Sequence, residues 1–424
     1  MLTDKHYQVN LTSANRTLFP DTSLSLIERA GPEELNILAR KLYSDFHGVE
    51  ESEKQFDFLI QKVLLRTSIG DFVVDNNLSS ENVIVVECID REPAPDPCFS
   101  LPHKDWVSGV RCASDCIISS CYDGTVHAWN LAARPIGHFK AHEAIINGLC
   151  IIPGSMEDEN VMRIATASAD QSVVMTEFDR SKSKFIRTHV GHGHEEAALC
   201  VSSNTLGSRL ATGGSDNYLK IWNANSPKDV AKDWTEEPSN KPTKVGASNV
   251  AAITPIVTLA GHRSRITGTC WMNEDHVITS SWDHTICVWD TILLDRVSSL
   301  ACTCSLTAVS YSPLNQLLIS GSVDDYVRLW DPRSNEGKMV RSVYVGHSKW
   351  VSAVDWSKTN EHLFVSASYD GLMKLWDFRS TKVALYDLSG HSDRLLCCDF
   401  SSPTFMLSGG VDGTVNVYRT TKEC

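Results

Sequence analysis

Histidine and aspartate recur together along most of this 424-residue chain, a composition that a hydrolytic triad or a metal site would need. The most metal-like cluster is His192-Gly193-His194, which Glu195 and Glu196 follow directly. A bound metal there is disfavoured, because His192 also stands at a histidine position that repeats along the chain. Nothing resembles a nucleophile elbow, a phosphate-binding loop or paired catalytic carboxylates. The sequence therefore predicts a protein that is not an enzyme and has no metal or cofactor of its own.

The repeated feature is an Asp that is followed six residues later by a Trp or a Tyr. The pairs are Asp123/Trp129, Asp216/Trp222, Asp283/Trp289, Asp324/Trp330, Asp370/Trp376 and Asp412/Tyr418. A histidine stands upstream of most units, at His103, His142, His192, His262, His347 and His391. This spacing is typical of WD repeats, in which each unit forms one blade of a β-propeller.

The six-residue interval has a physical reason. Six is an even number, and side chains alternate between the two faces of a strand. The Asp often precedes Gly or Asn, as in Asp123-Gly124, which is typical of a tight turn between strands. We expect the Asp to accept a hydrogen bond from the histidine and the indole N–H to find a partner in the same network. These residues are therefore predicted to be structural pins, and not ligands or catalytic bases.

Seven units fit the chain, because the repeated aromatic positions lie 41–47 residues apart except for one interval of 67. The excess falls in residues 225–258, which are rich in Pro, Lys, Asn and Ser and are predicted to form a flexible insert. The second unit has Asp170 but carries Thr176 where Trp is expected, and Phe178 is the candidate to fill the space. The fifth unit has Cys302-Thr303-Cys304 in place of Gly-His. The chain ends near the third strand of the last blade, so residues near 97–101 are expected to supply its outer strand.

The first ninety residues show no blade pattern and are predicted to form a separate domain. Their order is two strands, a helix whose first turn contains Pro32, two short strands, a helical turn and a buried last strand over 82–88. This order predicts the ubiquitin-like α+β roll. The fold prediction is therefore mainly β, with a ubiquitin-like domain at 1–90, a Pro-rich linker at 91–100 and a seven-bladed propeller at 101–424.

Composition limits the classes of partner. The net charge is −13, and residues 1–97 contribute −8 of it (17 Asp and Glu against 9 Lys and Arg). An acidic chain disfavours nucleic-acid binding as the main activity, so contact with nucleic acid is expected to be indirect or minor. The 14 Cys form no CxxC pair, which disfavours a zinc site and favours a reducing compartment. No apolar run is long enough for a membrane span.

Several segments together resemble one family. They are "FDFLIQKVLLRTSIGDFV", "LSSENVIVVE", the linker "PAPDP" and the propeller entry "DWVSGV". This combination resembles the WD-repeat subunits of the PeBoW ribosome-assembly complex over essentially the whole chain. The resemblance implies a scaffold of the nucleolus and nucleoplasm that acts in maturation of the precursor large ribosomal subunit. It also implies that the propeller docks on the block-of-proliferation protein, which holds pescadillo, and that the AAA+ ATPase midasin grasps the ubiquitin-like domain.

The resemblance also implies a role for Glu81, which follows Leu78-Ser79-Ser80. In the family, a carboxylate at this turn completes the shell of a Mg²⁺ ion held by midasin, and hard divalent cations prefer oxygen ligands. Without the family, Glu81 is an ordinary solvated acid of a turn. Glu87 and Asp90 are the weaker alternatives.

Two other readings stay open. Notchless is a second ribosome factor with a ubiquitin-like domain and a propeller, but it is expected to carry eight blades. A ubiquitin-ligase substrate adaptor would read its substrate with a ring of basic residues on one propeller face, which the mildly acidic propeller disfavours. The sequence does not indicate which propeller face meets the partner, what the 225–258 insert contacts, or which nuclear-import signal is used.

Overall fold

The computed structural model describes residues 5–13, 18–48, 54–79, 82–113, 115–154, 160–225, 250–333 and 340–420. The chain divides into two compact units. The first comprises Met1–Ala94 with Asp377–Ala384, and the second comprises Pro95–Trp376 with Leu385–Cys424. Among the described residues, no helix is both long and apolar enough to cross a membrane.

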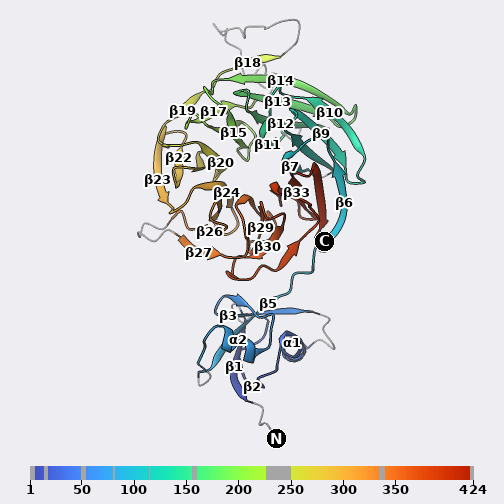
Figure 1. Cartoon of the computed structure of the whole chain (residues 1–424), viewed down its shortest axis with the longest axis vertical. Coiled ribbons are helices and arrows are strands. Elements are labelled where there is room, and N and C mark those ends of the chain that lie inside the picture. Colours follow the sequence, from blue (N-terminus) through green and yellow to red (C-terminus); the bar gives the residue numbers. More distant parts are fainter. Residues whose placement is uncertain are drawn as a thin grey trace. The chain divides into compact units, whose positions relative to one another are not determined.

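The first unit is built on one five-stranded mixed sheet with the strand order β2-β1-β5-β3-β4 (Figure 1). Its elements are β1 (His6–Ser13), β2 (Thr22–Ile27), α1 (Pro32–His47), β3 (Phe56–Ile60), β4 (Val63–Leu64), α2 (Ile69–Asp75) and β5 (Ile84–Asp90). Strands β1 and β5 are parallel at the centre of the sheet, and the other pairs are antiparallel. This arrangement is the ubiquitin-like roll that the sequence predicts.

Helix α1 begins and ends where local chemistry requires it. Pro32 occupies the first turn, where its missing N–H costs nothing, and the Glu34 carboxylate accepts a hydrogen bond from the Gly31 N–H at 2.9 Å. Gly48 ends the helix in the left-handed region with φ 66° and donates its N–H to the Ser44 carbonyl.

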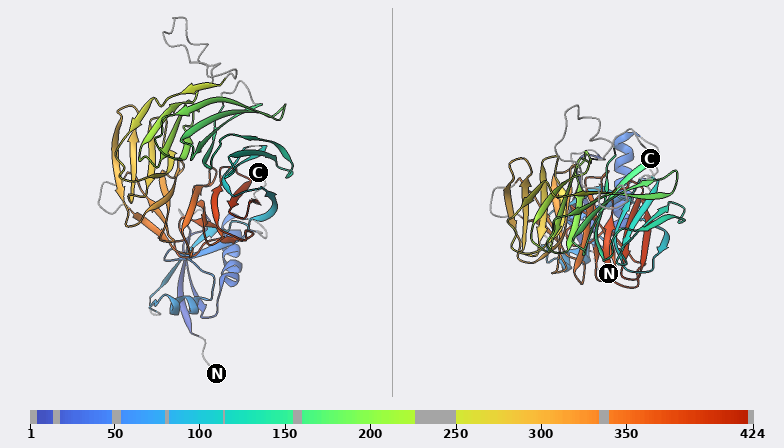
Figure 2. Two further views of the ribbon diagram at one scale, coloured as in Figure 1. Left: turned by 45° about the horizontal axis from the view of Figure 1, so that its top comes forward. Right: turned by 90° about the horizontal axis from the view of Figure 1, so that it is seen from above.

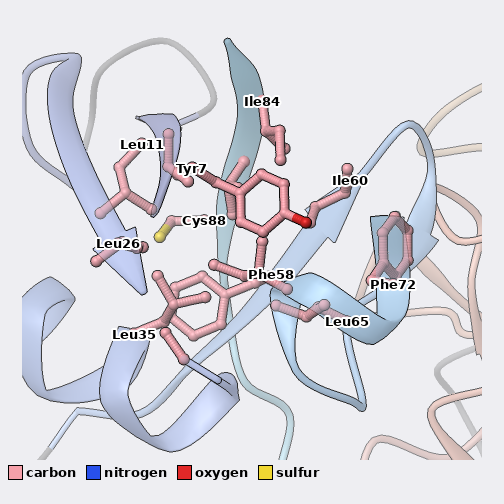
Figure 3. Packing of buried hydrophobic residues seen from close by; sticks show 14 of the residues in the cluster. Tyr7, Leu11, Leu26, Leu35, Phe58, Ile60, Leu65, Phe72, Ile84 and Cys88 are labelled. Carbon is pink, nitrogen blue, oxygen red and sulfur yellow. The ribbon is translucent and has the colours of Figure 1, made fainter. Parts of the chain in front are cut away.

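The core of this unit lies between α1 and the sheet. Leu35 of the helix and Tyr7 and Phe58 of the sheet are at most 1% exposed and belong to one apolar cluster (Figure 3). The buried Asn36 side chain bonds both backbone groups of Phe56, at 2.6 Å to its carbonyl and 2.9 Å from its N–H. These two bonds fix the helix against β3 while satisfying a buried amide.

The second unit is a ring of seven blades, each built on four antiparallel strands, with a fifth strand added in parallel to blade 2 (Figures 1 and 2). Blades 1 to 3 are β7 (Val107–Cys112), β8 (Cys116–Cys121), β9 (Thr125–Asn130) and β10 (Pro135–Lys140); β11 (Ile146–Ile152), β12 (Val161–Ser168), β13 (Ser172–Asp179) and β14 (Lys184–His192); and β15 (Ala198–Ser203), β16 (Arg209–Gly214), β17 (Leu219–Asn223) and β19 (Val257–Leu259). Blades 4 and 5 are β20 (Ile266–Trp271), β21 (His276–Ser281), β22 (Thr285–Asp290) and β23 (Asp295–Ala301); and β24 (Leu306–Ser312), β25 (Leu317–Ser322), β26 (Val327–Trp330) and β27 (Val340–Tyr344). Blades 6 and 7 are β28 (Val351–Trp356), β29 (Leu363–Ser368), β30 (Met373–Asp377) and β31 (Tyr386–Leu388); and β32 (Leu395–Asp399), β33 (Phe405–Gly410), β34 (Thr414–Arg419) and β6 (Asp96–Pro102). The first strand of each blade contacts the first strands of both neighbouring blades, and β32 meets β7, so the ring is closed.

The ring closes with a strand from the opposite end of the chain. Strand β6 pairs antiparallel with β34, as predicted, so the last blade has no unpaired third strand. Because β6 begins at Asp96, the prediction that residues 91–100 form a linker is wrong from residue 96 onward. A strand at the edge of a sheet tolerates Pro97, because its missing N–H can lie on the side that is not paired.

The predicted insert also ends earlier than residue 258. Residues 226–249 lie outside the described part of the chain, and so do residues 155–159, an acidic stretch in the second repeat unit. After them, β18 (Ala251–Ile253) pairs in parallel with β14 of blade 2, and β19 forms the outer strand of blade 3 (Figure 1). The prediction of a loop over 251–258 is therefore wrong, because Pro255 separates two three-residue strands that take their stability from neighbouring blades.

Candidate functional site: the blade pins and the turn before β5

Blade 6 shows the full network that the repeated residues form. His347 Nδ1 lies 2.8 Å from the Asp370 carboxylate, and its Nε2 lies 2.7 Å from the Ser366 hydroxyl. A carboxylate can only accept, so Nδ1 carries the proton and Nε2 accepts from Ser366. The Trp376 indole N–H then donates to the same hydroxyl oxygen at 2.8 Å. The four side chains thus join the segment before β28 to β29, to the turn that follows β29 and to β30.

The Ser-His-Asp geometry of this network is not a hydrolytic site. Ser366 and Trp376 are fully buried, so no substrate can reach the hydroxyl. Burial raises the pKa of Asp370, but the hydrogen bond and charge interaction with His347, together with the N–H groups of Leu372 and Ser348, outweigh it and lower that pKa to about 2. The carboxylate therefore stays ionised and holds the imidazole in one orientation.

Blades 3, 4 and 7 repeat the arrangement. Their sets are His194, Asp216, Thr212 and Trp222; His262, Asp283, Thr279 and Trp289; and His391, Asp412, Ser408 and Tyr418. In blade 7 the Tyr418 hydroxyl donates to the Ser389 carbonyl at 3.3 Å and so takes a different partner from the indoles.

The prediction for His192 is wrong, because His194 occupies the pin position of blade 3. His194 Nδ1 lies 2.9 Å from Asp216, whereas His192 is an exposed residue at the end of β14. A signal for this exists in the sequence. His194 precedes its Asp by 22 residues, within the 21–23 that separate the His and Asp of blades 4, 6 and 7.

Blade 2 keeps its His–Asp pair without a Trp. His142 Nδ1 lies 3.0 Å from Asp170, and Nε2 lies 2.8 Å from the Thr166 hydroxyl. Thr176 is buried at the position of the missing indole. Phe178 is fully buried two residues later and packs between blades 1 and 2, with its ring 4.4 Å from that of Phe185. An aromatic ring thus fills the space between these blades as the sequence suggests.

Blade 1 does not join His103 to Asp123. His103 Nδ1 lies 3.0 Å from the Leu101 carbonyl and Nε2 lies 2.7 Å from the Ser119 hydroxyl. Burial, with the neighbouring His127, lowers the pKa of His103 to about 4, so the ring is neutral. The Trp129 indole N–H is buried and has no acceptor among the described residues. The predicted pin of this blade is therefore incomplete.

Blade 5 replaces the histidine with an arginine that the sequence reading misses. Arg328 Nη1 donates to Asp324 at 2.9 Å and to the Ser322 hydroxyl at 2.7 Å, and Arg328 is only 7% exposed. The Trp330 indole still donates to Ser320 at 2.8 Å. Burial raises the pKa of Asp324, but the hydrogen bonds from Arg328 hold it well below its usual range. The sequence does contain a signal for this exchange. In the repeat unit that lacks the upstream histidine, a cation stands two residues before the repeated Trp.

Ser80 and Glu81 lie outside the residues that the structure describes, but the segments on both sides of them are placed. Before them, the Leu78 N–H donates to the Val73 carbonyl at 2.9 Å and its side chain packs against the core. After them, Ile84 is buried at the start of β5, while Asn82 is exposed. Leu78 and Ile84, on either side of these two residues, are thus both packed into the core of the unit.

The two alternative carboxylates occupy less suitable positions. Glu87 lies within β5 and is half-buried, and Asp90 is ion-paired with Lys54 at 2.9 Å. Among the described residues, no group of three or more His, Cys, Asp or Glu side chains could hold a metal ion.

Family comparisons match both units. Residues 183–223, 253–290, 295–331, 337–377 and 382–419 match the family described as WD domain, G-beta repeat, and residues 7–73 match the NLE (NUC135) domain. The matched repeats cover the three inner strands of blades 3 to 7, and the first of them also covers β14 of blade 2, whereas blade 1 and the inner strands of blade 2 lie outside the matched residues.

Curated relatives match along nearly the whole chain. A ribosome biogenesis protein WDR12 homolog of Brugia malayi is 40% identical over 94% of this chain and 92% of its own length. The homolog of Aedes aegypti is 38% identical over 96% of this chain and 94% of its own. The homolog of Anopheles gambiae is 36% identical over 99% and 96%.

Proposed function

The chain belongs to the WDR12 family of WD-repeat ribosome biogenesis proteins, and on this premise we propose that it is a non-catalytic scaffold for large ribosomal subunit assembly and ribosomal RNA processing. The observation that carries the proposal is the full-length similarity to these homologs, over both the ubiquitin-like unit and the propeller. A scaffold of this kind works in the nucleolus and nucleoplasm, on precursor particles of the large subunit.

The propeller is proposed to dock on the block-of-proliferation protein, which also holds pescadillo. Its construction supports a docking role. The repeated histidines with a paired Asp are buried and bonded through both ring nitrogens, which makes the blades rigid and leaves these residues unavailable for chemistry. A rigid platform loses little conformational freedom when it binds a partner.

The ubiquitin-like unit is proposed to be held by midasin through Glu81 and a Mg²⁺ ion of midasin. Mg²⁺ prefers oxygen ligands in a strict octahedral shell, so a carboxylate from a partner can complete a shell that the ATPase leaves open. The described neighbours of Glu81 support this role, because Ser79 and Asn82 are exposed while Leu78 and Ile84, a few residues away, are held in the core. Pulling on such a turn would transmit force to β5 at the centre of the sheet.

The test is a pull-down of the full chain with the metal-site domain of midasin, in Mg²⁺ and in EDTA. Glu81→Ala and Glu81→Gln are expected to abolish the Mg²⁺-dependent binding, because neither variant supplies a charged oxygen ligand. Asp75→Ala removes another acid of the same unit and serves as the matched control. Binding of the block-of-proliferation protein should be unchanged in all variants. Normal binding of midasin by Glu81→Ala would refute the carboxylate mechanism.

A further inference from the structure

One pair of positions recurs at the same edge of all seven blades. The residue after the second strand donates its backbone N–H to the carbonyl of the residue before the first strand. The pairs are Tyr122/Trp106, Ala169/Ile145, Ser215/Ala197, Trp282/Arg265, Val323/Ser305, Tyr369/Trp350 and Val411/Arg394. Four blades make this bond without an aromatic ring, so the fold does not require the rings that blades 1, 4 and 6 carry.

In blades 1 and 6 an exposed tryptophan is paired with a partly buried tyrosine. Trp106 lies 5.2 Å from Tyr122, and Trp350 lies stacked 5.8 Å from Tyr369. The two tryptophans are 39% and 43% exposed. Large aromatic side chains that the fold leaves at the surface are the type that carries most binding energy at protein interfaces.

Five residues of these pairs, Tyr122, Arg265, Trp282, Trp350 and Tyr369, line a cavity of about 260 Å³ at the centre of the ring. The second residue of every blade's first strand lines it, from Ser108 of β7 to Leu396 of β32, together with four of the aromatic rings. Polar groups of the lining are already used: Thr267, for example, donates to the Leu306 carbonyl at 2.8 Å and Ser352 to the Leu395 carbonyl at 2.8 Å.

Arg265 is the charged group of this cavity. The lining contains one cation, Arg265, and no Asp or Glu. Its guanidinium carbon Cζ lies 3.2 Å from the centre of the Trp282 ring, within cation–π distance. No carboxylate in the described part of the chain lies within ion-pair distance of it, whereas Arg394 of blade 7 is paired with Asp393. The cavity therefore offers a fixed cation without a counter-charge, among exposed rings.

We infer that this end of the central channel binds an acidic segment of a protein partner, with a carboxylate on Arg265 and adjacent apolar side chains on the rings of blades 1, 4 and 6. Arg pairs with a carboxylate through its planar fork of N–H donors. A polyphosphate chain is disfavoured because the protein carries a net charge of −13, which repels a polyanion but still permits a local ion pair. The inference rests on the proposed function in one respect: the segment is expected to come from a protein of the precursor particle.

The first experiment places a photo-crosslinking amino acid at Leu199, which lines the cavity, in the otherwise intact chain in cells. The crosslinked product is then sequenced. The expected product is a protein segment with Asp or Glu beside apolar residues. A crosslink to RNA, a crosslink to a segment without an acid, or no crosslink in particles that contain the chain would overturn the inference. An acidic segment from a protein outside precursor particles would support the site while refuting the proposed function.

The second experiment measures the affinity of the crosslinked segment, as a synthetic peptide, for the full chain. Arg265→Glu is expected to weaken binding by about tenfold or more, and replacing the acid of the peptide by Lys should restore it. Trp350→Ala, at an exposed position of another blade, should also weaken binding, so the outcome does not depend on one variant folding. Arg296→Glu, an exposed arginine of β23 in the same blade as Arg265, is the control. Equal affinities for Arg265→Glu and Arg296→Glu would overturn the inference.

Discussion

Replacing one repeated tryptophan by phenylalanine should cost very different amounts in blades 6 and 1. Trp376 and Trp129 are both buried, at 0% and 7% exposure, so Phe removes a similar apolar area from each. Trp376→Phe also removes the 2.8 Å hydrogen bond to Ser366, with a net loss of about 1 kcal/mol. Trp129→Phe removes a buried N–H without an acceptor in the described residues, which offsets the packing loss by about 1 kcal/mol or more. We expect Trp376→Phe to be the more destabilising by about 2 kcal/mol.

The assay is urea unfolding of the full chain, followed by far-ultraviolet circular dichroism at several protein concentrations. A difference in midpoint at a common slope reports the difference in unfolding free energy. Trp222→Phe is the matched control, because its indole donates to Thr212 at 2.8 Å as Trp376 does to Ser366, and it should behave like Trp376→Phe. Equal losses at Trp376 and Trp129 would refute the reasoning, since the shared hydroxyl would then contribute nothing to the blade.

Three other predictions concern charge and closure. Arg328→Ala should destabilise the propeller by about 3 kcal/mol, because it leaves the Asp324 carboxylate poorly solvated. Loss of the exposed Arg333 should cost much less, because water screens its ion pair with Asp331. Urea midpoints compare the two variants, and similar costs would contradict the argument. Hydrogen bonding lowers the folded-state pKa of Asp370 to about 2, so its carboxylate stabilises the fold above about pH 4 and loses this effect as the pH falls through 2. The difference in unfolding free energy between the wild type and Asp370→Asn should therefore disappear over that pH range, which a pH series of urea midpoints would measure. Removing all residues before β6 should leave a folded monomeric propeller. Removing β6 as well should expose the edge of β34 and cause aggregation, which sedimentation would detect. If the chain without β6 is also monomeric, β6 is dispensable for closing the ring.

The irregular blades explain where the repeat pattern is weakest in the sequence. Blades 1 and 2 are closed parts of the ring, yet one lacks the His–Asp bond and the other lacks the Trp. Phe178 and the packing around it compensate in blade 2, since its cluster includes residues of both blades. Neighbour-to-neighbour packing thus maintains a blade whose own hydrogen-bond network is incomplete.

The sequence by itself determined the seven-bladed ring, the ubiquitin-like roll and most of the pins. The alternation of side chains along strands and the fixed Asp-to-aromatic interval involve residues that are close in sequence, so both can be recognised from one sequence. The closing strand β6 was also predictable, because a blade with three strands must obtain a fourth from elsewhere.

Only the tertiary structure decided which partner each charged or aromatic group meets. The strands at 251–259 depend on β14 and β17, which neighbouring blades place opposite them. The choice of His194 over His192 and the substitution of Arg328 for a histidine have signals in the sequence, in the His-to-Asp spacing and in the position of the cation, but only the structure shows the partners that these side chains meet. The cavity around Arg265 is the clearest case. Its lining comes from all seven blades, so equivalent residues 39 to 68 positions apart in the chain converge on one axis, from Ser108 to Leu396. Only closure of the ring brings them together.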